Sequence, residues 1–437
     1  MNPTSVGVIG ILIMVAIFFT KMPVAYVMTM VGFVGFSILM SVDGALNFLP
    51  SNFYDSFISY DLSTIPLYVL MGQLAFNCGI SRKLYNTGYT FLGNTRGGLA
   101  MATVASCTAF GAVCGSSPAT AATMATVGMP EMRRFGYSDS LAAGSVASGG
   151  GLGMIMPPSV VLIIYGILTE QSIGALFVSG ILPAILMTFL FIGCVYITCR
   201  IDPTKGPKGE KFTLGQKIKS LTGLLDTLAV FVLVMSGLFF GFFTPTESAA
   251  VGVFGVLAVA VIRKELTWKA FVKSLYETLQ TSSMILFLIA GAVVFSKFLA
   301  VTRIPFEVAT WVSGFDMPPY MVLAIIVGIY FLGGCFMDSL GLIMLTIPVF
   351  YPVILNLGYD PIWFGVIIVL VTEMGVITPP VGINVYVVYG VCQNVIGDIS
   401  LEEIFKGIFP FLISTLIGII LMTMFPQIIL FLPNLLY

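Results

Sequence analysis

The sequence predicts an all-α polytopic membrane protein built from two inverted-topology repeats. First, 58% of its 437 residues are apolar and only 9% are charged, whereas roughly a quarter of an average soluble domain is charged. Second, apolar runs approaching the ~20 residues of a membrane-spanning helix recur along the chain. Third, the two halves match at an offset of 222 residues. So few charges cannot cover a soluble fold, and a net charge of −1 gives no reason to expect nucleic-acid binding.

The apolar runs predict the first membrane helices. They cover residues 6–20, 182–199, 228–243, 248–262, 284–298 and 409–425. The first run has no positive residue before it and no small-residue cleavage pattern after it, so we interpret it as a retained helix and not a signal peptide. The seven cysteines are scattered through apolar segments without a C-x-x-C pair, which predicts packing residues and no structural disulfide.

The basic residues predict the topology. With the amino terminus outside, seven breaks face the cytoplasm and hold 17 of the 19 Lys and Arg residues, as the positive-inside rule requires. These breaks lie at Lys21, Arg82–Lys83, Arg96, Arg133–Arg134, 200–219, 263–273 and Lys406. The count holds only if residues 97–130 form a hairpin that enters from the cytoplasm and returns to it. Its counterpart, residues 319–356 between Asp316 and Asp360, enters from the other side. We therefore expect about ten crossings, two re-entrant hairpins and both termini in the periplasm.

Two segments are amphipathic. Between residues 267 and 280 the apolar side chains share one helical face, whereas Lys269, Lys273 and Glu277 recur every four residues on another. This pattern predicts a helix lying in the membrane interface. Residues 46–57 show a weaker version. A short connecting loop remains the alternative for both segments.

The internal repeat divides the chain into residues 1–222 and 223–437. Between residues 117 and 158, nine of 42 positions are identical to those 222 residues later, and five of these are Gly or Pro. Apolar bias alone would match Leu, Ile and Val instead. Each half holds about five crossings, one hairpin and one broken helix, at residues 139–166 and 361–391. An odd number of crossings inserts the second half upside down, and such repeats place ligand sites near the midplane.

Four breaks are candidate sites: the hairpin tips at 112–120 and 333–341, and the broken helices at 148–159 and 372–384. Glycine allows the chain to turn there, while Ser, Thr and Asp supply hard oxygen ligands for an alkali cation. We expect unwinding to free backbone carbonyls for sodium and amides for a carboxylate, because half-helix ends point at such ligands.

Two acidic residues, Asp338 and Glu373, lie deep in these elements. A charge in the bilayer costs about 2.5–3.5 kcal/mol on the insertion scale, so both are functional candidates. Glu373 has the alternative of capping or pairing structurally. Ser116, Ser117 and the neighbouring hydroxyl residues have the alternative of packing helices together.

Several motifs in order resemble the large membrane subunit of tripartite ATP-independent periplasmic (TRAP) transporters. They are the segments 97–103, 110–120, 129–132, 151–159 and 244–247, and the resemblance extends over essentially the whole chain. It implies an elevator mechanism in which the hairpins and broken helices move against a scaffold braced by interfacial helices. It also implies two partners: a small four-helix membrane subunit, expected as a separate chain, and a soluble periplasmic binding protein that delivers the substrate.

The resemblance also assigns site residues. The expected sodium-binding residues are Ser116, Ser117, Gly151, Gly153, Ser339, Gly375 and Thr378. The expected substrate-binding residues are Ser116, Ser159 and Asp338. Pro118 departs from the small or branched residue expected after Ser117, which puts the geometry of the first tip in doubt.

The resemblance, together with the hydroxyl-rich breaks, predicts sodium-driven uptake of a small organic acid, a C4-dicarboxylate, a sugar acid or a sialic acid, at a bacterial inner membrane. We expect at least two Na⁺ ions per substrate. An enzyme is disfavoured, because the chain has no histidine, no Gly-x-Gly-Asp run and no G-x-x-x-x-G-K motif. The remaining alternative is a stand-alone proton- or sodium-coupled carrier without a binding protein, in which Asp338 and Glu373 carry protons.

Overall fold

The computed structural model describes residues 2–18, 20, 22–313, 318–397 and 399–436. The helices of the first half are α1 (Pro3–Phe18), α2 (Val24–Leu39), α3 (Val42–Ile58), η1 (Asp61–Ser63), α4 (Thr64–Asn77), α5 (Ile80–Leu92), α6 (Gly98–Cys114), α7 (Ser117–Arg134), α8 (Asp139–Ile155), α9 (Val160–Thr169) and α10 (Ile173–Ile201), and α11 (Leu214–Phe239) crosses the boundary between the halves. Those of the second half are α12 (Pro245–Ile262), α13 (Trp268–Thr302), α14 (Ile304–Ser313), α15 (Pro319–Gly334), α16 (Ser339–Asn356), α17 (Pro361–Ile377), α18 (Ile383–Val395), α19 (Leu401–Met424) and α20 (Gln427–Leu436).

The fold class predicted from composition is confirmed. Within the described ranges no strand occurs, and a single isolated bridge joins Arg96 to Lys208. Seven segments of these ranges are long and apolar enough to cross a membrane, and six shorter apolar helices accompany them. The protein is a multi-pass helical membrane protein.

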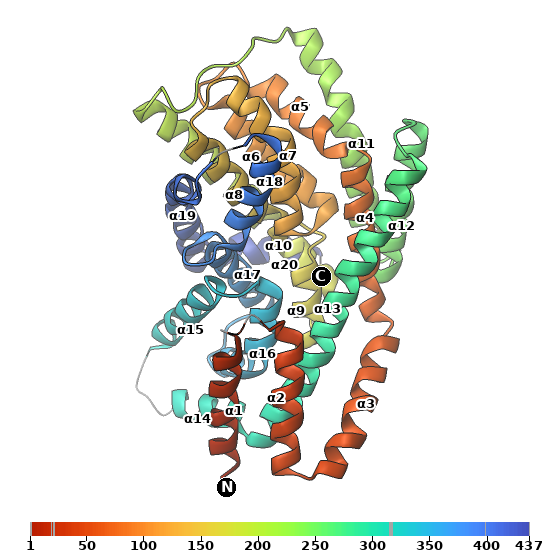
Figure 1. Cartoon of the computed structure of the whole chain (residues 1–437), viewed down its shortest axis with the longest axis vertical. Helices are drawn as coiled ribbons and strands as arrows, with labels where there is room; N and C mark the ends of the chain where they lie inside the picture. Colours follow the sequence, from red (N-terminus) through yellow and green to blue (C-terminus); the bar gives the residue numbers. More distant parts are fainter. Residues whose placement is uncertain (1, 19, 21, 314–317, 398, 437) are drawn as a thin grey trace.

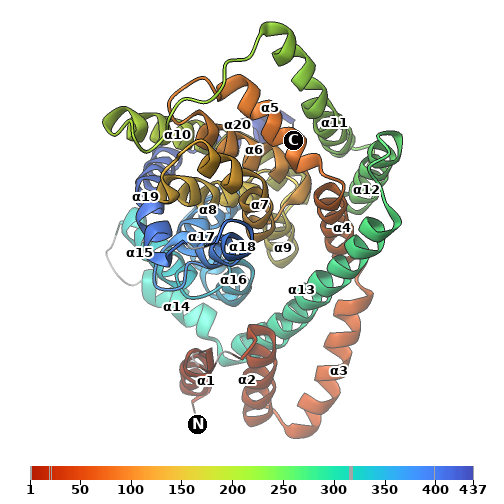
Figure 2. The same ribbon diagram turned by 45° about the horizontal axis from the view of Figure 1, so that its top comes forward.

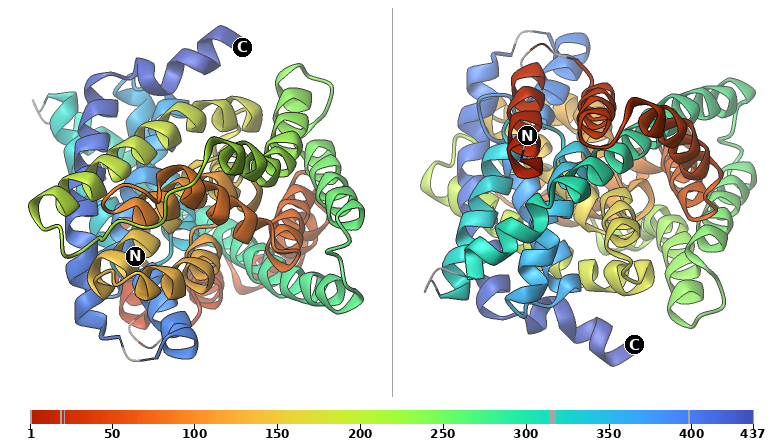
Figure 3. Two further views of the ribbon diagram at one scale, coloured as in Figure 1. Left: turned by 90° about the horizontal axis from the view of Figure 1, so that it is seen from above. Right: turned by 90° about the horizontal axis from the view of Figure 1, so that it is seen from below.

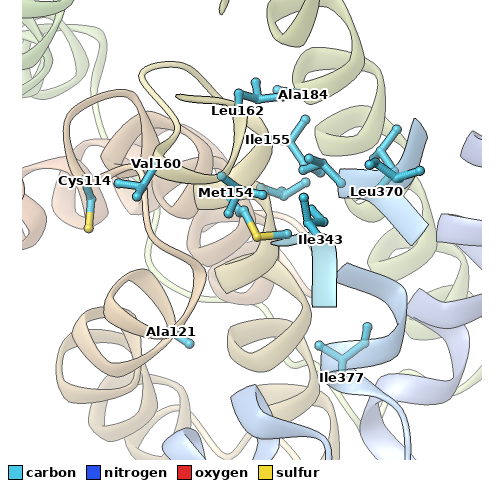
Figure 4. Packing of buried hydrophobic residues seen from close by; sticks show 14 of the residues in the cluster. Cys114, Ala121, Met154, Ile155, Val160, Leu162, Ala184, Ile343, Leu370 and Ile377 are labelled. Atoms are coloured by element: carbon cyan, nitrogen blue, oxygen red, sulfur yellow. The ribbon is translucent and has the colours of Figure 1, made fainter. Parts of the chain in front are cut away.

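The helices form two parts. An inner group consists of α6–α10 and α15–α20, and an outer layer of α2–α4 and α11–α13 lies along one side of it (Figures 1 and 2). Seen from above and from below, the green helices of the outer layer lie on one side and the blue helices of the inner group on the other (Figure 3). Inside the inner group, Met154 and Ile155 at the end of α8 lie close to Ile343 of α16 and Leu370 of α17 (Figure 4).

The amphipathic segment 267–280 is helical as predicted, but it does not form a separate helix. It forms the first part of α13, a single helix of 35 residues that continues through the apolar run 284–298. The Thr267 hydroxyl caps its start by accepting from the Ala270 amide at 3.1 Å. No proline lies between Trp268 and Thr302, and the first glycine is Gly291, so no residue ends the helix earlier. The weaker segment 46–57 is helical too, within α3.

The four predicted breaks exist but are shorter than expected. They lie at residues 115–116, 156–159, 335–338 and 378–382. The glycines at 149–153 remain inside α8, because they allow close helix packing: a Cβ on Gly150 would lie 2.6 Å from the Ala121 Cβ. The helix ends only where Pro157 and Pro158 follow, since proline cannot continue the backbone hydrogen bonding.

Corresponding close contacts occur in both halves. A Cβ on Gly111 of α6 would lie 2.6 Å from the Gly153 Cα in α8, and a Cβ on Gly375 of α17 would lie 2.6 Å from the Gly334 Cα in α15. Each hairpin therefore packs backbone to backbone on the broken helix of its own half. This correspondence supports the inverted repeat with boundaries 1–222 and 223–437, which stays our proposal.

The two ends of the first predicted hairpin meet on one side of the molecule. The Leu99 amide donates to the Tyr137 hydroxyl at 3.1 Å, so the start of α6 lies beside the end of α7. The loop after α10 covers both, since the Gly97 amide donates to the Gly206 carbonyl at 2.9 Å and the Ser138 amide to the Lys205 carbonyl at 3.0 Å. Three of the predicted cytoplasmic segments thus lie together. Lys21 and Asp316, which we also used for the topology, lie outside the described residues.

Candidate substrate and cation site

A cavity of about 670 Å³ separates the two hairpin tips from α4 and α13 of the outer layer. The first tip contributes Ser116 and Ser117, and the second contributes Asp338 and Ser339. The structure therefore brings together four of the residues predicted from sequence. The polar residues on the opposite wall are Gln73 of α4 and Glu277, Gln280 and Thr281 of α13.

The first tip is held by glycine and proline. Gly115 has a φ of +64°, and a Cβ there would lie 2.3 Å from the Pro158 carbonyl oxygen, so only glycine fits. Pro118 stands in the first turn of α7, where its fixed φ and missing N–H favour helix initiation. This position explains why the unexpected proline is compatible with the tip. Ser116 precedes α7 with extended backbone and makes no capping bond, so its hydroxyl is available to the cavity.

The second tip is capped by Asp338. Its carboxylate accepts from the Gly341 amide at 3.0 Å at the start of α16, which is the usual role of an N-cap aspartate. The Ser339 hydroxyl is buried and has no protein partner. Each tip is tied to the break of its own half by a backbone bond, from the Val160 amide to the Gly115 carbonyl at 3.4 Å and from the Val381 amide to the Cys335 carbonyl at 3.3 Å.

The other predicted residues do not line the cavity. Gly151, Gly153 and Gly375 lie inside helices, so they are not part of unwound backbone as we expected. Ser159 caps α9 by accepting from the Leu162 amide at 3.3 Å. The Thr378 hydroxyl donates to the Met374 carbonyl at 2.6 Å within its own helix end.

A buried polar cluster behind the first tip was only partly expected from sequence. The Asn384 side-chain nitrogen of α18 lies 2.7 Å from the Ser117 hydroxyl, 3.2 Å from the Ala147 carbonyl oxygen and 3.4 Å from Glu373 Oε1. Gly151 faces Glu373 across the helix crossing, and a Cβ on this glycine would lie 1.6 Å from Glu373 Oε1. Gly151 and Glu373 occupy equivalent positions at the repeat offset of 222.

The polar wall on α13 was also missed. Glu277 accepts from the Asn77 amide at 3.1 Å and lies 3.6 Å from the Lys273 ammonium. Its place in the polar stripe of segment 267–280 indicated an exposed face toward lipid headgroups. Of this stripe, Glu277 lines the cavity, whereas Lys269 and Lys273 do not.

Comparison with known proteins decides the family. Residues 11–428 match the model of the DctM component of tripartite ATP-independent periplasmic transporters. The chain belongs to this family. It is 32% identical over 399 residues to the C4-dicarboxylate TRAP transporter large permease protein DctM of Pseudomonas aeruginosa, covering 91% of this chain and 92% of that protein. It is 31% identical over 422 residues to the sialic acid TRAP transporter large permease protein SiaM of Vibrio cholerae, covering 95% and 96%.

Among solved structures, the YdaH transporter of Alcanivorax borkumensis is similar with a TM-score of 0.65 over 98% of this chain and all of that chain. The sequence identity is 14%, so this likeness concerns the fold alone. The chain is therefore a large permease subunit of the TRAP family with a polytopic helical transporter fold.

Proposed function

We propose that this chain takes up a small organic acid by sodium symport, with the cavity between the tips and α13 as the substrate site. The main support is that the N-terminal ends of α7 and α16 both reach this cavity, with Ser116 and Asp338–Ser339 at its lining. A helix N-terminus has a positive dipole end that favours carboxylates, and that of α7 has no capping side chain, whereas at α16 the Asp338 carboxylate already accepts from the Gly341 amide. Among the lining residues there is no Lys or Arg, so these amides and hydroxyls, together with bound cations, are the groups available to an anion.

The substrate classes that we propose are a C4-dicarboxylate, a sugar acid or a sialic acid. A cavity of about 670 Å³ lies within the usual range of small-molecule sites, about 300–1,000 Å³. Specificity is shared with the binding protein that delivers the acid.

The proposed coupling ion is Na⁺, with at least two ions per substrate. A monocarboxylate moving with one Na⁺ gains nothing from the membrane potential, whereas each additional charge contributes about 2.3 kcal/mol per 100 mV. Ser116, Ser117 and Ser339 supply hydroxyl oxygens at the tips. An electroneutral uptake of a monocarboxylate in charge-transport recordings would contradict this stoichiometry.

The proposed moving part is the inner group with its hairpins and broken helices, and the proposed scaffold is the outer layer. A small four-helix membrane subunit packs on the scaffold and a periplasmic protein docks from outside. The proposed orientation has both termini in the periplasm, which the positive-inside rule favours. Cysteine accessibility at the loop after α10, tested from each side of sealed vesicles, measures this orientation.

The deciding experiment reconstitutes the chain with its small subunit and follows uptake of a labelled C4-dicarboxylate and a labelled sialic acid. The sodium gradient and the periplasmic binding protein are each supplied or withheld. Uptake that requires both establishes the tripartite sodium symporter. Uptake that requires neither, or that follows a pH gradient alone, favours the stand-alone carrier.

A further inference from the structure

The two walls of the cavity differ in how they treat a negative charge. On the tip side, Ser116 precedes the uncapped N-terminal end of α7, a position that favours a carboxylate. On the opposite wall, Glu277 of α13 lines the cavity with a side chain that is 30% exposed. Asp338 stands at the N-terminal end of α16, whereas Glu277 lies well beyond the first turn of its helix. The helix dipole therefore compensates the charge of Asp338 and not that of Glu277.

The Glu277 carboxylate is held in place by a neighbouring helix. The Asn77 amide of α4 donates to it at 3.1 Å and lies 3.0 Å from the Ser274 hydroxyl of α13. The Lys273 ammonium lies 3.6 Å from the carboxylate and 5.8 Å from the centre of the Phe76 ring. Lys273 is 55% exposed and does not line the cavity. Such a solvent-exposed pair is weak, so Glu277 still presents a negative charge to the cavity.

We propose that Glu277 is a specificity-determining residue, which accepts hydrogen bonds from the far end of the substrate and rejects a second carboxylate there. The other polar side chains of this wall, Gln73, Gln280 and Thr281, are uncharged. Neither Lys nor Arg occurs among the described residues that line the cavity. The site therefore suits a monocarboxylic acid whose far end carries hydroxyl or amide donors. This inference rests on the proposed function, because it takes the cavity as the substrate site.

The preference follows from the charge of each possible substrate. A hydroxyl or amide group donates a hydrogen bond to a carboxylate, and such a charge-assisted bond is stronger than one between neutral groups. A second carboxylate has no hydrogen to donate, and in a partly buried cavity its repulsion by Glu277 is stronger than in water. Specificity commonly includes a repulsive element of this kind. Among the proposed substrate classes, Glu277 thus favours a sugar acid or a sialic acid over a C4-dicarboxylate.

The test compares two acids of the same size that differ in one charge. Succinate has two carboxylates, and its monoamide, succinamate, has an uncharged amide in place of one of them. Titration calorimetry of the purified chain with its small subunit, in saturating NaCl and without the binding protein, measures the preference of the membrane part alone. We expect the wild type to bind succinamate more tightly than succinate. In Glu277→Gln, the ratio of the two dissociation constants shifts toward succinate at least about tenfold, equivalent to about 1.4 kcal/mol.

Lys273→Gln is the matched control, because it breaks the same ion pair but leaves the carboxylate. It should not shift the ratio toward succinate. An unchanged ratio in Glu277→Gln, or an equal shift in Lys273→Gln, overturns the specificity role. Glutamine keeps an oxygen that accepts from Asn77. Should Glu277→Gln nevertheless fail to assemble, Gln280→Glu adds a carboxylate to the wall and should weaken the binding of succinate relative to succinamate; an unchanged ratio there overturns the role.

Ser116→Trp separates this inference from the proposed function. The indole occupies the cavity at the first tip, so this variant should lose the binding of both acids. That loss, together with an unchanged ratio in Glu277→Gln, rejects the role of Glu277 and leaves the cavity as the substrate site. Binding of both acids that persists in Ser116→Trp rejects the cavity and this inference with it. The same holds if the wild type binds neither acid nor a sialic acid saturably.

Discussion

Replacing Gly375 with alanine should force α15 away from α17. The added Cβ would lie 2.6 Å from the Gly334 Cα, 2.7 Å from its carbonyl carbon and 2.8 Å from the Phe331 carbonyl oxygen. All three atoms belong to the backbone, so no side chain can rotate to make room. Ordinary contact begins at 3.4 Å, and the helices must therefore separate by about 0.8 Å. Overpacking of this kind costs about 1–3 kcal/mol.

Thermal unfolding of the purified variant, with uptake measured in parallel, checks this value. A cost of 1–3 kcal/mol lowers the midpoint by at least about 2 °C, on the usual scaling for large domains. Gly111→Ala should have a similar effect, because its Cβ would lie at the same 2.6 Å from the Gly153 Cα in the other half. Gly328→Ala is the control within α15, since no atom lies within 4 Å of its added Cβ. Alanine there improves helix propensity by about 1 kcal/mol, so its midpoint should be equal or higher.

Equal midpoints for Gly375→Ala and Gly328→Ala would refute this reasoning. They would mean that α15 moves away from α17 without a loss of stability. The close contact between Gly375 and Gly334 would then not constrain the position of the tip. A lowered unfolding midpoint together with normal uptake would instead show that this contact contributes to stability and is not needed for transport.

Three further predictions concern single side chains. Asp338→Ala should abolish uptake while the chain still assembles. Asp338→Ser should retain the cap of α16, worth about 1 kcal/mol, without restoring uptake. Normal uptake by either variant would show that the Asp338 carboxylate is not part of the site. Asp226→Ala should lower the unfolding midpoint, because Asp226 lies 2.8 Å from Arg263 and 3.8 Å from Lys83 with a side chain only 13% exposed; Glu402→Gln, at an exposed pair, should not. Ser159→Ala should cost about 1 kcal/mol of stability through loss of the α9 cap, and a change in the sodium dependence of uptake alone would show a ligand role instead.

The sequence was sufficient to predict the breaks that proline causes. Pro157–Pro158 and Pro379–Pro380 follow the ends of α8 and α17, because two consecutive prolines remove two backbone donors in a row, whereas single prolines such as Pro130 remain inside their helices. The sequence was not sufficient to predict whether the glycines break a helix, because this depends on which residues of other helices pack against them. Gly150 and Gly151 stay helical because Ala121 and Glu373 lie against them, and neither contact is visible in the local sequence.

The sequence likewise predicted some parts of the candidate site and not others. The tips were found, since hydroxyl residues beside glycine mark them locally. The contact between Ser117 and Asn384 joins residues 267 positions apart, so only the fold could reveal it. The continuity of α13, by contrast, was available from the absence of any helix-ending residue after Trp268.

The length of α13 makes the cavity sensitive to the thickness of the lipid bilayer. Its 35 residues extend over about 52 Å, well beyond the ~30 Å of the hydrocarbon layer. One end exposes Trp268, and Gln280 and Thr281 farther along line the cavity. A thinner or thicker membrane changes the tilt of such a helix. Gln280 and Thr281 belong to this same helix, so lipid chain length should alter the distance between α13 and the hairpin tips. The rate of transport should change with that distance.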